Sequence, residues 1–122
     1  MRVVGPLRDT IIAKLSDHEA QQIIRTVLTK PKTVGEIEKE LDLPQSTLYK
    51  KVSELKECGL LMVEEFVFST DGKKEALYAC PFTEVRIKVG HVEMELDLIE
   101  TKESLARRWF ELFSSRSSAS HS

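Results

Sequence analysis

The stretch that decides the fold is residues 33–81, TVGEIEKELDLPQSTLYKKVSELKECGLLMVEEFVFSTDGKKEALYACP. Its first half predicts two short helices joined by a tight link. Thr33 is a candidate N-cap with Glu36 as its capping-box partner. Pro44 suits the first turn of the second helix because its missing N–H group would have no helical partner there. Gly59 fits a left-handed C-cap, so the second helix is expected to end near it.

Both predicted helices carry one apolar stripe at helical spacing, which indicates one buried face each. The stripes are Val34, Ile37 and Leu41 in the first helix, and Leu48, Val52 and Leu55 in the second. A β-hairpin follows them. Its predicted strands are Leu60–Phe68 and Glu75–Cys80, joined by the turn residues Thr70–Lys73.

On the N-terminal side, the sequence predicts one more helix. Ser16 or Asp17 is its candidate N-cap, and Pro31 stops it. Its apolar stripe comprises Ala20, Ile23, Ile24, Val27 and Leu28. Residues 2–14 are partly apolar but show no decisive period.

On the C-terminal side, residues 84–98 alternate between apolar and charged side chains around Gly90-His91. This pattern predicts a second hairpin with a two-residue turn of type II′. The expected register places Val89 opposite Val92 and Lys88 opposite Glu93, with Ile87–Met94, Arg86–Glu95 and Val85–Leu96 following. Residues 102–113 are expected to form a terminal helix, and residues 114–122 a disordered tail.

The composition sets limits on the class of protein. With 122 residues, 41% hydrophobic and 31% charged, the chain fits one globular unit. It lacks an apolar run long enough for a membrane span and a secretory N-terminus, so a cytoplasmic location is expected. The net charge is −2, and between Lys30 and Lys74 eight lysines face nine acidic residues. Any basic surface must therefore come from how the lysines are distributed.

The apolar pattern over Leu15–Pro81 resembles that of the winged helix-turn-helix transcription regulators, and especially archaeal ArsR-like and MarR-like members. The residues that carry the resemblance are Val34, Ile37, Leu41, Leu43, Leu48, Val52, Leu55, Gly59, Leu60 and Leu61. It implies an α+β fold with a three-helix core and a β-hairpin wing. The additional C-terminal hairpin and terminal helix have no counterpart by motif. We expect residues 1–81 to form the DNA-binding part with an N-terminal extension, and residues 82–113 to form a dimerisation element.

The chain also departs from this pattern. Glu38 stands where such units often have a small residue, and the cysteine pair and the C-terminal Asp/His cluster of the metal sensors are absent. No cofactor or metal is therefore expected. No catalytic constellation appears among His18, His91 and His121 and their neighbours, so an enzyme is not expected either.

The resemblance implies double-stranded DNA as a partner, with the second predicted helix in the major groove and the wing on the backbone. Its polar face offers hydroxyl and amide groups near the N-terminus, which are groups that read base edges. The wing turn and the start of the first helix offer phosphate contacts. The candidate DNA-binding residues are Lys32, Thr33, Gln45, Ser46, Thr47, Tyr49, Lys50, Lys51, Lys73 and Lys74.

Regulators of this kind act as homodimers, and the apolar terminal helix is a candidate interface. Its residues are Leu105, Trp109, Leu112 and Phe113, with Leu7, Ile11 and Ile12 as possible additions. Core packing within one subunit remains open for the same helix. Two other readings remain as well: a winged-helix module that binds protein without DNA, and a thiol switch between Cys58 and Cys80.

Overall fold

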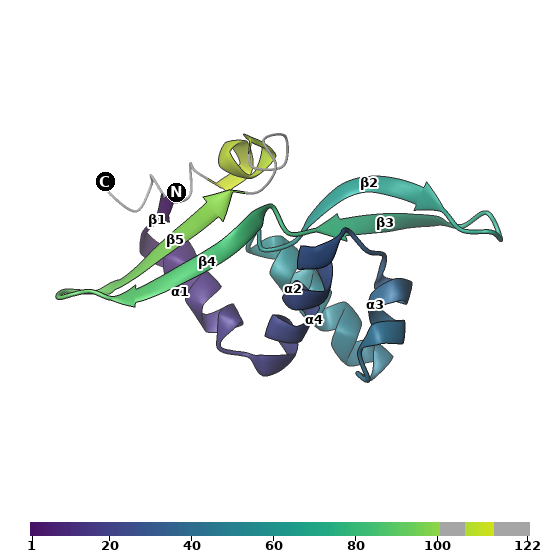
Figure 1. The fold of residues 1–122 in the computed structure, drawn as a ribbon, viewed down its shortest axis with the longest axis horizontal. Helices are drawn as coiled ribbons and strands as arrows, with labels where there is room; N and C mark the ends of the chain where they lie inside the picture. Colours follow the sequence, from purple (N-terminus) through teal and green to yellow (C-terminus); the bar gives the residue numbers. More distant parts are fainter. Residues whose placement is uncertain (101–106, 114–122) are drawn as a thin grey trace.

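The computed structural model describes residues 1–100 and 107–113. Four helices form the body, and two β-hairpins project from it in opposite directions (Figure 1). The helices are α1 (Gly5–Leu15), α2 (His18–Thr29), α3 (Val34–Glu40) and α4 (Gln45–Glu57). The strands are β1 (Arg2–Val3), β2 (Met62–Phe68), β3 (Lys74–Ala79), β4 (Phe82–Val89) and β5 (Met94–Glu100). A further helix covers residues 107–113.

The helix boundaries follow the predicted capping residues. The side chain of Asp17 accepts a hydrogen bond from the Ala20 N–H at the start of α2. Thr33 and Glu36 form the complete capping box of α3. Gly59 has φ +86°, which is the left-handed conformation expected after α4. The winged helix-turn-helix architecture of α2–α4 and β2–β3 is therefore confirmed.

Helix α1 was not predicted, because residues 2–14 show no clear apolar period. Pro6 lies in its first turn, and Leu7 and Ile11 are buried on it. Before it, Arg2 and Val3 form a short strand that pairs with Asp97 and Leu96 of β5. The N-terminal segment therefore belongs to the same sheet as the second hairpin, whose strand order is β1-β5-β4.

The register predicted for the second hairpin was wrong by two residues. Val89 pairs with Met94 and Ile87 with Leu96, so the turn spans residues 90–93 and is not the two-residue Gly90-His91 turn. A shift of two preserves the alternation of faces, and the pattern alone does not distinguish the two registers. The observed register buries Leu96 and Leu98 completely and allows β5 to pair with β1.

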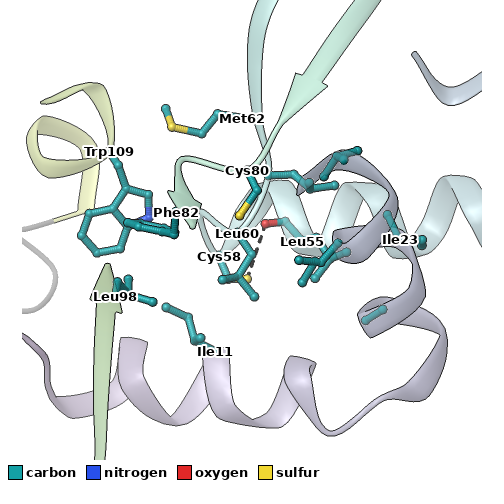
Figure 2. Packing of buried hydrophobic residues seen from close by; sticks show 14 of the residues in the cluster. Ile11, Ile23, Leu55, Cys58, Leu60, Met62, Cys80, Phe82, Leu98 and Trp109 are labelled. Carbon is teal, nitrogen blue, oxygen red and sulfur yellow. Dashed lines mark hydrogen bonds between the residues drawn. The ribbon is translucent and has the colours of Figure 1, made fainter. Parts of the chain in front are cut away.

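The core extends from the helices to the start of β4 and the C-terminal helix. Trp109 is 1% exposed and contacts Phe82 edge to face (Figure 2). It also stacks on Phe113. Trp109 and Phe113 therefore pack within their own subunit, which corrects their assignment to a dimer interface. Leu7 and Ile11 are likewise buried in this core. Leu112 is 59% exposed, and Leu105 lies outside the described residues.

Cys58 and Cys80 are free, buried thiols of the same core (Figure 2). Burial raises the pKa of the Cys58 thiol and raises that of Cys80 to about 11. The thiolate is the reactive form of cysteine, so both groups are held in the unreactive form near neutral pH. This favours a packing role for them over a thiol switch.

Candidate nucleic-acid interface

Helix α4 presents one buried face and one exposed polar face, as its sequence predicts. Leu48, Val52 and Leu55 are at most 2% exposed and anchor the helix against the core. Thr47 is half-buried at the boundary between the two faces. The exposed face carries Gln45, Ser46, Tyr49, Lys50 and Ser53.

The start of α4 has no side-chain cap within the described residues. Pro44 occupies the N-cap position, and the first turn contains no acidic residue. The first N–H groups of a helix have no intrahelical acceptor and form a site suited to anions. The beginning of this polar face is therefore able to accept a phosphate through the backbone.

The β2–β3 hairpin is the wing, and its tip is held in a defined turn. The Ser69 N–H donates to the Lys73 carbonyl at 2.9 Å, and the Gly72 N–H donates to the Ser69 carbonyl at 2.9 Å. The Ser69 hydroxyl also donates to Asp71, and this bond is the main cause that lowers the pKa of the Asp71 carboxyl. The Asp71 carboxylate thus accepts a hydrogen bond within the turn, while Lys73 and Lys74 remain exposed.

Helix α4 and the wing meet at a cavity of about 270 Å³. Tyr49 of α4 and Lys74 of the wing both line it. The Lys74 Nζ lies 4.3 Å from the centre of the Phe66 ring, which is a cation–π distance that fixes the ammonium over the wing. The other lining residues are Val34, Gly35, Glu75, Ala76 and Tyr78.

Tyr78 was missed as a groove residue in the sequence, although a signal was present. Lys74, Ala76 and Tyr78 alternate along β3, so they share one face of the strand. Burial is the main cause that raises the pKa of the Tyr78 hydroxyl, with the nearby Tyr49 as a second cause. The two tyrosines both line the cavity between α4 and the wing.

Lys32 is not exposed to a DNA ligand, which corrects its prediction as a DNA contact. The residue is 4% exposed, and its Nζ contacts Glu40 Oε1 at 2.8 Å and the Thr26 carbonyl at 2.7 Å. Its backbone N–H donates to the Tyr78 carbonyl at 2.9 Å and its carbonyl accepts from the Tyr78 N–H. Lys32 therefore connects α2, α3 and the wing, and its charge is neutralised inside the fold.

Thr33 and Lys51 are also engaged within the chain. Thr33 is 7% exposed and its side chain caps α3. The Lys51 Nζ lies 2.6 Å from Asp17 Oδ2 and 3.9 Å from Glu19 Oε1, so it points to the start of α2. Lys51 is the main cause that lowers the pKa of the Asp17 carboxyl. Both residues are corrected from groove contacts to structural roles.

Of the five lysines expected on the groove side, Lys50, Lys73 and Lys74 remain exposed. Positions 45, 46, 49, 50 and 53 of α4 carry no acidic residue, and the exposed Glu57 lies one turn beyond Ser53 on the same side of the helix. Glu54 is instead 2.6 Å from the Lys14 Nζ of α1. Glu75 is the acidic residue that the α4–wing cavity does contain. The polar face is therefore modestly basic, with Lys50 in the N-terminal half of α4 and Lys73 and Lys74 on the wing.

Comparison with known proteins gives the same architecture. The family model described as sugar-specific transcriptional regulator TrmB matches residues 13–80, which is more than half of the chain. No curated protein matches the chain. The winged helix-turn-helix regulator predicted from the sequence is confirmed, whereas the ArsR-like and archaeal assignments stay predictions. With α2–α4 and the wing inside the match, the chain belongs to the TrmB family of transcriptional regulators, whose helix-turn-helix unit binds DNA.

Proposed function

We propose that this protein regulates transcription as a homodimer on operator DNA, with α4 in the major groove and the wing on the adjacent backbone. One observation carries the proposal. Tyr49 of α4 and Lys74 of the wing line a single cavity, so the polar helix face and the basic hairpin form one continuous surface. A duplex lying on this surface would meet both elements together.

The side chains on this surface divide into two kinds of contact. Gln45 and Ser46 lie at the start of α4, where amide and hydroxyl groups can read base edges. Tyr49 and Lys50 follow one turn later and add a hydroxyl group and a positive charge. Thr47, the free backbone N–H groups of the first turn, Lys73 and Lys74 supply phosphate contacts, which position the protein without reading sequence.

The proposal is tested by selecting bound DNA from a random pool and measuring affinity for the selected site. Tyr49→Ala and Lys50→Ala should each weaken specific binding by roughly tenfold, in line with the loss of one good base or phosphate contact. Lys56→Ala is the matched control, because Lys56 is an exposed lysine of α4 at a separate cavity with Phe113. Unchanged affinity in both test variants would count against the assignment.

The alternative, a winged-helix module that binds only protein, differs in its salt dependence. Phosphate-driven binding weakens steeply as salt rises because bound counterions are released. The net charge of −2 favours the alternative, and the absence of exposed acidic residues from the N-terminal part of α4, residues 45–53, favours DNA. Retention on generic DNA that is lost between low and moderate salt supports DNA binding, and no retention at low salt supports the alternative.

The family description names sugars, and we propose a hydroxylated small molecule as effector on the other side of α4. A cavity of about 470 Å³ lies there, lined by Pro6, Leu7, Thr10, Lys14, Glu54, Glu57 and Cys58. Its polar groups come from both α1 and the C-terminal half of α4, so an occupant would contact α4 away from the start of its polar face. A sugar panel in a thermal-shift assay tests this, with Thr10→Val expected to abolish any shift.

A further inference from the structure

The outer edge of β4 is free in the described part of the chain. The sheet order β1-β5-β4 gives β4 one neighbour, so the backbone groups on its other side have no partner strand. Such an edge is a template on which another strand can pair. Residues 83, 84 and 86–89 of β4 are all exposed.

The β4–β5 hairpin also exposes apolar side chains near its tip. Val92 is 95% exposed, Val89 79%, Ile87 42% and Met94 37%. Ile87, Val89 and Met94 share the face of the sheet that buries Leu96 and Leu98 nearer the body, because Ile87 pairs with Leu96 and Val89 with Met94. Val92 lies in the turn between the two strands. The core face of the sheet therefore continues toward the tip, where its apolar side chains are partly to largely exposed.

The opposite face of β4 carries charged residues whose order suits antiparallel pairing with β4 of a second copy. Glu84, Arg86 and Lys88 alternate along this face, and their side chains are 50%, 64% and 77% exposed. In an antiparallel pair centred on Val85, Glu84 of each copy lies opposite Arg86 of the other. In a pair centred on Arg86, Glu84 lies opposite Lys88. Opposite charges at facing positions stabilise a strand pair.

We propose that a second copy of this chain pairs antiparallel along the β4 edge and joins the two three-stranded sheets into one six-stranded sheet. This names the surface of the homodimer on which the proposed function rests. A two-fold axis perpendicular to the sheet relates the copies, so the contact is self-complementary and closed. Charged residues on an edge discourage indiscriminate pairing, and their alternation here selects an antiparallel copy.

The arrangement also accounts for the exposed tip. In an antiparallel pair, Val89 of one copy lies beside the start of β4 in the other, and the tip extends past it. The apolar face of the tip then lies on the same side of the joined sheet as the helices of the other copy. Within one copy, the wing and the tip of the β4–β5 hairpin point in opposite directions (Figure 1).

Charge variants test the pairing. Glu84→Lys leaves only basic residues at positions 84, 86 and 88, and the double variant Arg86→Glu/Lys88→Glu leaves only acidic ones. Each should self-associate at least about tenfold more weakly than the wild type in sedimentation equilibrium, and an equimolar mixture should form a heterodimer. Lys73→Glu on the wing is the matched control and should leave association unchanged. Circular dichroism checks that each variant is folded.

A second measurement uses the wild type alone. Amide hydrogen exchange at β4 should slow as protein concentration rises, while exchange in the wing should not. A wild type that stays monomeric at about 100 μM, or variants that associate as the wild type does, would overturn the proposal. A monomer that still binds selected DNA refutes the pairing and the homodimer, and leaves the DNA-binding part of the proposed function standing. A dimer that follows the charge rules but binds no DNA refutes only the proposed function.

Discussion

The two hairpins share one local design and differ in what surrounds them. Each is an antiparallel pair with one irregularity, between Val63 and Glu65 in the wing and between Phe82 and Glu84 in the second hairpin. The wing ends in a hydrogen-bonded turn with two exposed lysines, of which Lys74 lines a cavity together with Tyr49 of α4. The second hairpin ends in exposed valines, and its sheet is completed by the N-terminus. Similar strands thus present one surface suited to phosphates and another suited to protein.

The largest expected effect comes from a residue close to the start of both hairpins. Gly59 precedes β2, and Trp109 and Phe113 cover it next to Phe82 of β4. A Cβ atom at Gly59 would lie 2.4 Å from Trp109 Nε1, at a backbone φ of +86°. Gly59→Ala should lower the free energy of unfolding by about 3 kcal/mol or more, through overpacking and left-handed strain. Chemical denaturation measures the loss.

The matched control for this variant is in the wing. Gly72 has φ +83° but a Cβ atom there would meet nothing within 4 Å. Gly72→Ala should therefore cost only the left-handed strain, about 1–2 kcal/mol. Equal losses for the two variants would mean that the contact with the C-terminal helix adds nothing at Gly59.

The next largest effect concerns DNA affinity, which should depend on the lysines of the wing and not on those of the second hairpin. The double variant Lys73→Glu/Lys74→Glu should weaken DNA binding by about 10–100-fold and reduce the slope of log affinity against log salt by about 2. Lys88→Glu on the second hairpin should leave the DNA affinity of a single half-site unchanged. If Lys88→Glu weakened half-site binding as much, the division of roles between the hairpins would be wrong. Fluorescence anisotropy over a salt series supplies both quantities.

A smaller effect concerns how the wing is tied to the helices. Lys32 is the main cause that lowers the pKa of the Glu40 carboxyl, with Thr26 second. A lowered carboxyl pKa adds stability above the unfolded-state value, near 4.5, and this stability is lost as pH falls through the folded-state value. The wild type should therefore lose this contribution below about pH 4.5, and Lys32→Met should lose less over the same range. Parallel pH dependences of thermal unfolding in the two proteins would refute this.

The smallest effect is expected at the tip of the second hairpin. Val92 is 95% exposed in the single subunit, so Val92→Ser should change the stability of dilute protein by less than about 0.5 kcal/mol. Leu96→Ala on the same hairpin removes a fully buried side chain and should cost about 2–5 kcal/mol. A large loss at Val92 in dilute protein would show that the tip is covered within the subunit.

Much of the fold could be predicted because its signals are local. The Asp17 cap, the Thr33–Glu36 capping box and Gly59 each fix a helix end through residues a few positions apart. The hairpin register could not be predicted in this way. Registers two residues apart have the same alternation, and β1, which is distant in sequence, completes the observed one.

Only part of the candidate site could be predicted, because helix faces follow from local spacing whereas the direction of a lysine side chain depends on distant residues. Helical spacing places Gln45, Ser46, Tyr49 and Lys50 on the exposed face of α4 without reference to the rest of the chain. The direction of a lysine depends on its tertiary partners, and the carboxylates at Glu40 and Asp17 draw Lys32 and Lys51 inward. An apolar stripe such as that of Trp109 and Phe113 has the same pattern whether it covers its own core or another subunit's.

The packing of Trp109 gives the protein an optical reporter of its own. It is the one tryptophan of the sequence, and it lies buried against Phe82 and Phe113 over Gly59. Its emission should be blue-shifted while the C-terminal helix is docked, and should move to the red when the helix is released. Undocking can therefore be followed by fluorescence in the unlabelled protein and timed against DNA binding.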